Sequence, residues 1–192
     1  MPEPRPEVLD FLLTRRSRPA KTLTAPVPGR DELMRLLTAA ARSPDHGKLE
    51  PWRFLVLERP ALQRLASLVR ARGAARGETA ETVEKAAQAY ETSPLAVVVI
   101  SVPKASAKVP EIEQCYSAGA VCLALLNAAL AAGWGANWLT GWPAHDRDFV
   151  ESGLGLGATE KVAGLIHIGT ETAIPPERPR PDVAALTEWV TA

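Results

Sequence analysis

The chain has 192 residues, enough for one domain with a substantial core, and we expect a single domain over 1–192. Lys and Arg together number 22, as do Asp and Glu, so the formal net charge is zero. This balance argues against nucleic acid or a membrane surface as a partner, because both favour proteins with a basic excess.

The predicted elements of the first half are mostly helices. Regularly spaced leucines predict amphipathic helices, and an apolar run after Trp52 predicts a strand. In order, we expect helices over 7–14 and 30–42, a strand over 52–57, a helix from 60 to a glycine-rich break at 73–77, and a polar helix over 78–90.

The second half contains the longest apolar stretches. The continuous run at 95–102 is typical of a central strand that is buried on both faces. The apolar segment 118–135 is too short and too rich in alanine for a membrane span, and we interpret it as part of a buried helix. The expected elements are a helix over 112–132 capped by Gly133, a short strand or extended turn over 135–139, and a short helix that opens at 143–146. A strand over 161–168 follows, and then a proline- and arginine-rich tail over 174–182 that precedes an apolar segment at 183–190. Helices dominate and the strands are widely spaced, which favours an α+β sandwich.

The cysteine content and the N-terminus indicate a cytoplasmic protein. Cys115 and Cys122 are too few for a disulfide scaffold, and residues 1–6 are polar and proline-rich, unlike a secretory leader.

Arg15, Arg16 and Ser17 follow the first predicted helix. Guanidinium groups bind phosphate through paired hydrogen bonds, and a serine hydroxyl can add another. Alternatively, basic residues at a helix C-terminus only offset the helix dipole.

A rigid polar loop, 43–52, joins a predicted helix to a predicted strand. Pro44 and Pro51 bound a segment that contains Asp45, His46 and Lys48. Such loops often carry ligand contacts, but this one can also be a plain turn in which Asp45 caps and His46 faces water.

Taken together, and in this order, these segments resemble the flavin-dependent nitroreductase family. Further similarities are the long helix, the Trp138–Gly141 segment after it, and the stretch 161–170. The resemblance implies an α+β fold with a central, mostly antiparallel sheet flanked by helices. It also implies a homodimer with FMN at the subunit interface, in which the N-terminal helix and the C-terminal tail wrap the neighbour.

The resemblance also implies which residues bind the cofactor. Arg15, Arg16 and Ser17 would hold the FMN phosphate and ribityl chain, with Arg178 or Arg180 from the tail as a further phosphate contact. Arg42, His46 and Lys48 would reach the flavin from the partner subunit, and Trp138, Leu139 and Thr140 would lie along its ring. The chain has Thr140 where the family often has an acidic residue, and Glu50 where it often has Gln or Asn.

The expected activity is hydride transfer from NADPH or NADH through FMN to a nitroaromatic, a quinone or a similar small acceptor. The flavin carries the chemistry, so ping-pong kinetics and no catalytic side chain are expected. The alternative is a flavin-binding or interaction protein of the same fold without turnover, a reading that the departures at Glu50 and Thr140 keep open.

Three other motifs carry less weight. The glycines of 153–157 lie between a predicted helix and a strand, the reverse of a dinucleotide loop. The serine of 115–119 lies inside a predicted helix, which argues against a hydrolase elbow. His46, His145 and His167 are too far apart in the sequence to predict a metal site.

Overall fold

The centre of the molecule is a strand that has no polar face. β3 (Leu95–Ser101) is buried at every residue. In the computed structural model, which describes residues 3–191, β3 pairs antiparallel with β2 (Trp52–Glu58) on one side and β5 (Lys161–Glu171) on the other. Its side chains alternate between two separate cores, which explains why its sequence is apolar throughout. The predicted central strand is confirmed.

The rest of the sheet is built on β5. This strand also pairs antiparallel with β4 (Gly135–Leu139) and with the two-residue β1 (Leu23–Thr24). The strand order is β1-β5-β3-β2, with β4 beside β5. β1 was not predicted, because two residues are too few to show a strand periodicity.

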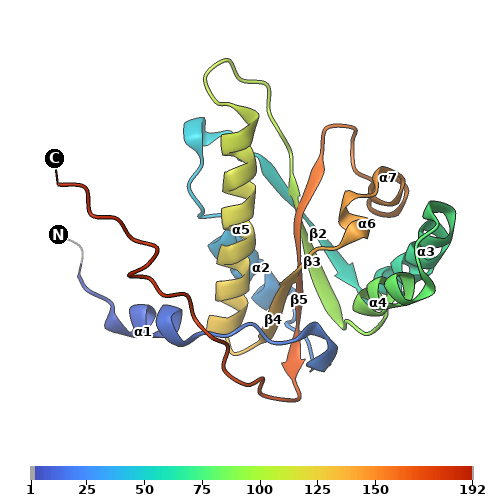
Figure 1. Ribbon diagram of the computed structural model, residues 1–192, viewed down its shortest axis with the longest axis horizontal. Coiled ribbons are helices and arrows are strands. Elements are labelled where there is room, and N and C mark those ends of the chain that lie inside the picture. The colour runs from blue at the N-terminus through green and yellow to red at the C-terminus, as the bar shows by residue number, and fades with distance from the viewer. Residues whose placement is uncertain (1–2, 192) are drawn as a thin grey trace.

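Helices cover both faces of the sheet, so the expected α+β sandwich is confirmed (Figure 1). One face packs against α2 (Arg30–Ala40) and α5 (Glu111–Ala131). The other face packs against α3 (Arg59–Arg76), α4 (Ala80–Glu91), α6 (Trp142–His145) and α7 (Arg147–Leu154). Short 3-10 turns lie at Ala20–Thr22 and His46–Lys48.

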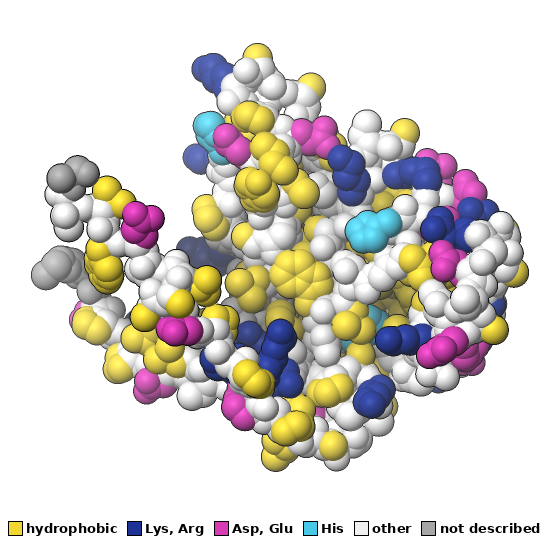
Figure 2. Space-filling model, viewed as in Figure 1, with side chains coloured by type: hydrophobic (Ala, Val, Ile, Leu, Met, Phe, Trp, Pro, Cys, Tyr) yellow, Lys and Arg dark blue, Asp and Glu magenta, His cyan; other side chains and the backbone are white. Residues whose placement is uncertain are grey.

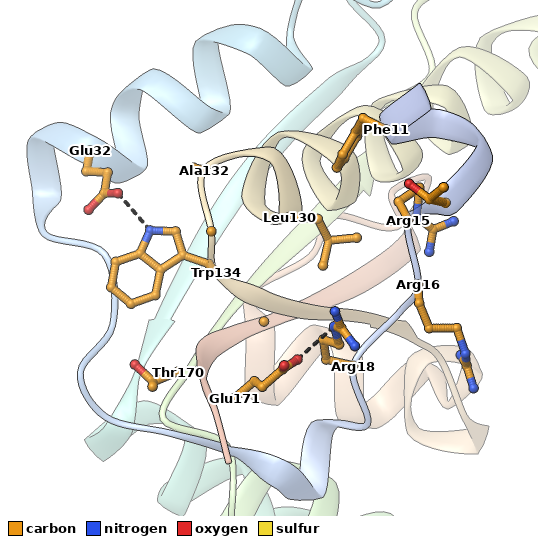
Figure 3. A pocket seen from close by; sticks show the side chains of 13 residues that line it. Phe11, Arg15, Arg16, Arg18, Glu32, Leu130, Ala132, Trp134, Thr170 and Glu171 are labelled. Atoms are coloured by element: carbon orange, nitrogen blue, oxygen red, sulfur yellow. Dashed lines mark hydrogen bonds and ion pairs between the residues drawn. The ribbon is translucent and has the colours of Figure 1, made fainter. Parts of the chain in front are cut away.

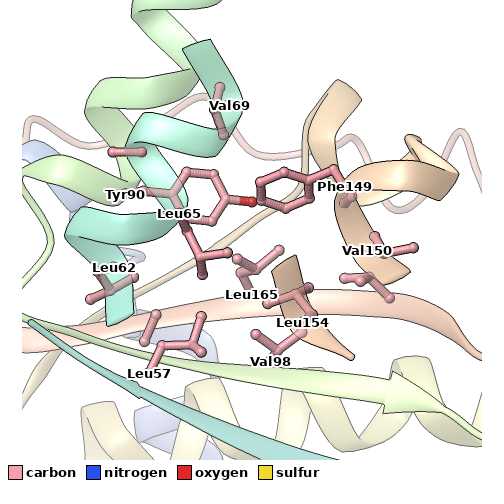
Figure 4. Close-up of a cluster of buried hydrophobic side chains, with 14 of the residues drawn as sticks. Leu57, Leu62, Leu65, Val69, Tyr90, Val98, Phe149, Val150, Leu154 and Leu165 are labelled. Carbon is pink, nitrogen blue, oxygen red and sulfur yellow. The ribbon is translucent and has the colours of Figure 1, made fainter. Parts of the chain in front are cut away.

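The core under α3, α4 and α7 is closed by aromatic side chains. Tyr90 and Phe149 meet edge to face with their ring centroids 5.7 Å apart (Figure 4). Leu62 and Leu65 of α3 are fully buried beside them. These contacts fix α4 and α7 against the sheet on the face opposite α5.

The helix end predicted within the glycine-rich break at 73–77 falls at its last residues. α3 continues through Gly73 to Arg76 and ends at Gly77, whose φ is +70°. A Cβ atom at Gly73 would lie 2.4 Å from Val83, so this glycine allows α4 to pack closely on α3. The helix predicted to open at 143–146 is divided in the structure, because α6 ends at His145 and α7 follows at once, with the Asp146 side chain as its N-cap accepting a hydrogen bond from the Phe149 N–H.

α5 is apolar on two faces, but the sheet covers only one of them. Val121, Cys122 and Leu125 are fully buried, whereas Ile112 and Tyr116 are 54% and 68% exposed. Among residues 3–191, α5 is the one helix long and apolar enough to cross a membrane, but core helices of soluble proteins meet the same criterion. Its packing against β3, β4 and β5 agrees with the core helix that we predicted.

The two ends of the chain leave the body of the molecule together. α1 (Pro6–Thr14) has no buried residue, and the described part of the chain after β5 contains neither helix nor strand. Figure 1 shows this tail running back beside α1. The apolar side chains of Leu13, Leu186 and Trp189 are 70%, 76% and 86% exposed, so this arm presents uncovered hydrophobic surface.

A paired charge ties the two strands that flank β3. Arg53 on β2 donates from Nε and from one terminal guanidinium nitrogen to Glu160, the residue before β5, at 2.7 and 2.8 Å. Glu160 also accepts a hydrogen bond from the Gly157 N–H. The Arg53 hydrogen bond, more than any other contact, lowers the pKa of Glu160 to about 2.

We predict that Glu160→Gln lowers the free energy of unfolding at pH 7 by about 1–3 kcal/mol, because charged hydrogen bonds are lost. A carboxyl group whose pKa is depressed by folding stabilises the protein above its unfolded pKa. The difference between wild type and variant should therefore shrink as the pH falls from about 4.5 to about 2. Urea unfolding at several pH values measures it.

Glu151→Gln is the matched control, since the Glu151–Arg147 pair has side chains 48% and 40% exposed. It should change the free energy of unfolding by less than about 0.5 kcal/mol. Equal losses in the free energy of unfolding of the two variants would show that the Arg53–Glu160 pair stabilises the fold no more than an exposed ion pair does.

Candidate functional site

The basic segment after α1 is held against the sheet by β4. The Arg18 N–H donates to the Ala136 carbonyl at 2.8 Å, and the Asn137 side-chain amide donates to the Arg18 carbonyl at 2.9 Å. These two bonds lay residues 15–18 alongside the strand that leads to Trp138. Two segments that the sequence analysis assigned to one site are therefore neighbours in the structure.

Arg15 and Arg16 are only partly satisfied where they lie. Arg15 donates to the Ser17 hydroxyl at 3.0 Å, and Arg16 donates to the Ser17 carbonyl at 3.3 Å. The Nε atoms of both arginines are buried without a hydrogen-bond partner among the described residues. Burial lowers the pKa of Arg15, and the nearby charges of Arg180 and Arg16 lower it further. Buried donors and converging positive charges of this kind favour an anionic ligand.

The two arginines border a cavity of about 580 Å³ at the C-terminal end of α5 (Figure 3). Two carboxylates also line it, but each already has a partner. Glu32 accepts a hydrogen bond from the Trp134 indole N–H at 2.7 Å, and Glu171 pairs with Arg18 at 2.7 Å. The charge left without a partner in this cavity is therefore positive.

The structure distinguishes the two tail arginines that the sequence left open. Arg180 reaches the Arg15 carbonyl at 3.4 Å and also pairs with Glu177. For the Arg178 side chain, no hydrogen bond or ion pair occurs within the described residues. Arg180 is therefore the tail arginine that joins the cluster.

The residues at the end of β4 pack partly on the sheet and partly line a cavity. The Trp138 indole lies over Gly164, where a Cβ atom would be only 2.1 Å from the indole nitrogen. Leu139 is partly buried and Thr140 is exposed. Both line a second cavity, of about 400 Å³, between the end of β4 and α4.

This second cavity contains residues that the sequence analysis missed. Lys85 of α4 borders it, as do the Trp142 indole, whose N–H is buried without a described partner, and His167. Burial lowers the pKa of His167 to about 4, and its Nδ1 contacts the Ser93 hydroxyl at 2.9 Å. Lys85 lies in the helix predicted over 78–90, but no local motif marks it as a ligand contact.

The loop of His46 lies at the opposite end of α5, where His46 Nδ1 is 2.8 Å from a carboxylate oxygen of Glu113 in the first turn of the helix. Arg42, His46 and Lys48 are all exposed. By contrast, Leu130 and Ala132 at the other end of α5 line the cavity of Arg15. Since an α-helix rises about 1.5 Å per residue, the two groups are roughly 25 Å apart along its axis. Within one chain, they cannot reach the same small ligand.

The sequence comparisons agree with the fold. The family model described as the nitroreductase family matches residues 12–170, so the chain belongs to the nitroreductase family. A protein of Escherichia coli strain K12, YdjA, is 32% identical over 164 residues, which cover 85% of this chain and 88% of that protein. A relative from Haemophilus influenzae is 36% identical over 165 residues, with the same two coverages.

Solved structures show the same fold. A nitroreductase-like family protein from Bacillus cereus matches with a TM-score of 0.79 and 22% identity, over 100% of both chains. A nitroreductase with bound FMN from Bacteroides fragilis matches with a TM-score of 0.75 and 21% identity, over 96% of this chain and 99% of the other. The fold predicted from the resemblance is thereby confirmed.

Proposed function

We propose that the chain is an FMN-dependent oxidoreductase that takes hydride from NADPH or NADH and passes it to a small acceptor. The observation that carries the proposal is the pair of buried guanidinium nitrogens of Arg15 and Arg16 beside Ser17, which have no partner in the part of the chain that the structure describes. The curated relatives support it, since both are provisionally named NAD(P)H nitroreductases.

The basic cluster suits the phosphate end of FMN. Arg15 and Arg16 have donors to spare, Ser17 offers a hydroxyl, and Arg180 adds a third guanidinium. A terminal phosphate carries more charge than the internal phosphates of FAD, and no adenosine-binding loop is evident in the sequence. The residues present therefore fit FMN better than FAD.

The end of β4 suits the flavin ring. Leu139 is the last residue of the strand that anchors the basic segment, Thr140 follows it, and both line the cavity that Lys85 borders. The bound flavin would supply hydride acceptance and donation. The chain would position it, and the Lys85 ammonium group would favour the negative charge that reduction adds.

The exposure of the residues that follow β4 supports the class of acceptor and the kinetic order that we propose. Thr140 and Gly141 are exposed, so one side of a ring bound here stays open to solvent. Nicotinamide and acceptor would then use the same face in turn, which gives ping-pong kinetics. A nitroaromatic or a quinone has the flat shape that such a face accepts.

The active form would be a homodimer with shared sites. Ile112, Tyr116, Gly119 and Leu123 fall on one face of α5, and a Cβ atom at Gly119 would meet nothing within 4 Å. Figure 2 shows apolar side chains gathered over α5 on this face of the molecule. If two α5 helices pack antiparallel about a twofold axis, the N-terminal turn of one lies near the C-terminal end of the other. The partner's Arg42, His46 and Lys48 would then approach the Arg15 cluster.

We predict that the purified protein carries FMN and that Arg15→Ala weakens FMN binding by about 1.5–3 kcal/mol, roughly ten- to hundredfold in Kd. Chromatography of the released cofactor and titration of the apoprotein measure these outcomes. Lys21→Ala, an exposed cation nearby, is the control and should leave the Kd unchanged. FAD or no flavin in wild type, or an unaltered Kd in Arg15→Ala, would contradict the assignment.

Turnover is tested by anaerobic addition of NADPH or NADH to the yellow holoprotein. We predict that the visible flavin absorbance is bleached and then returns when a quinone or a nitroaromatic is added. A holoprotein that neither nicotinamide bleaches would be a flavin-binding protein without this activity.

We predict that Leu123→Glu converts a dimer to monomers and reduces FMN binding, because it places a charge in the α5 interface. Leu123 is 46% exposed in one chain, so the fold itself should tolerate the change. Light scattering at micromolar concentration, with the flavin stoichiometry, measures both effects. Met34→Glu, at a residue 54% exposed on α2, is the control and should remain a dimer. A wild-type monomer that retains flavin would refute shared sites.

A further inference from the structure

The His46–Glu113 contact fixes the orientation of an exposed imidazole ring. His46 Nδ1 lies 2.8 Å from Glu113 Oε2. An ionised carboxylate can only accept hydrogen bonds, so Nδ1 must carry the hydrogen and donate it. The second nitrogen, Nε2, lies on the other side of the ring and is left available to another molecule.

The loop that delivers His46 has an unusual backbone. Gly47, Lys48 and Glu50 have φ values of +78°, +55° and +47°, in the left-handed region that residues with a side chain disfavour. The Asp45 carboxylate accepts a hydrogen bond from the Glu50 N–H at 2.9 Å and helps to hold this shape. Backbone strain of this kind is often found at ligand-binding sites.

Fold stability alone does not explain the pair. The side chains of His46 and Glu113 are 58% and 46% exposed, and ion pairs at such positions contribute little to stability. Glu113 also lies in the first turn of α5, where a carboxylate suits the helix dipole whether or not a histidine is present. The contact is therefore not needed to hold the fold, and its effect falls mainly on the orientation of His46.

We propose that Glu113 is a positioning residue for the cofactor site. It holds His46 with Nδ1 protonated and turns Nε2 toward the flavin bound by the partner chain. This inference rests on the proposed function, because the N-terminal turn of α5 meets a flavin only if two chains share the site. It resembles the general use of carboxylates to fix the tautomer and orientation of a functional histidine.

A double-mutant cycle on the full-length protein tests the inference. FMN affinity of the apoprotein is measured for wild type, His46→Ala, Glu113→Ala and the double variant. We expect each single substitution to raise the Kd three- to tenfold. If Glu113 acts only through His46, the double variant will stay within twofold of His46→Ala.

Two further variants separate positioning from a structural role. Glu113→Gln retains an oxygen that accepts from Nδ1–H, so it should restore the Kd to within twofold of wild type. Glu111→Ala removes the same charge from the same helix turn, where Glu111 pairs with Lys161 at 2.6 Å, and should leave the Kd unchanged. The melting temperature of each apoprotein should stay close to that of wild type.

Several results would overturn the inference. One is an unchanged FMN Kd in His46→Ala or Glu113→Ala, and another is a double variant in which the two losses of FMN affinity add. The others are a Glu113→Gln variant whose Kd is not restored, or a Glu111→Ala variant that loses as much FMN affinity as Glu113→Ala. If wild type binds FMN in these cases, the proposed function survives. If wild type binds no FMN, both the inference and the proposed function fail.

Discussion

The length and packing of α5 determine how this protein can build a binding site. One face of the helix completes a core with the sheet, and its other apolar face is uncovered in a single chain. The Arg15 cluster lies near its C-terminal end and the His46 loop near its N-terminal end, roughly 25 Å away. A site that uses both groups therefore needs a second α5 that runs the other way, which would also cover the exposed face.

The charges of the basic segment, residues 15–18, favour an anionic ligand at the C-terminal end of α5. Arg18 and Glu171 neutralise each other, whereas Arg15 and Arg16 retain buried donors that have no partner within residues 3–191. Leaving such donors unsatisfied costs about 1–3 kcal/mol each, which an anionic ligand would recover on binding. Two hydrogen bonds tie Arg18 to β4, and β4 contains Trp138 and leads directly to Thr140. The segments that would contact the phosphate and the ring of a flavin are therefore held in fixed positions relative to each other.

The sequence predicted features that depend on local pattern and missed those that depend on distant contacts. The apolar run at 95–102 has no polar face, which is typical of a central buried strand, and the structure confirms one at Leu95–Ser101. The glycine-rich break at 73–77 was predicted and contains the end of α3 at Gly77, but the role of Gly73 is to accommodate Val83 of the next helix, a contact that periodicity does not reveal. The basic segment and the loop of His46 were found through motifs. Lys85 and the Glu113 contact were not, because each comes from a helix remote in sequence from the motif that it accompanies.

Subunit complementation tests the central claim, a flavin site assembled from two chains, most directly. Arg15→Ala chains and chains carrying both Arg42→Ala and His46→Ala are prepared separately and then mixed under conditions that exchange subunits. A shared site predicts that each parent binds FMN weakly, whereas each mixed dimer regains one intact site and binds one FMN tightly. If mixing restores no tight binding although mixed dimers form, the flavin site lies within a single chain and the account is wrong.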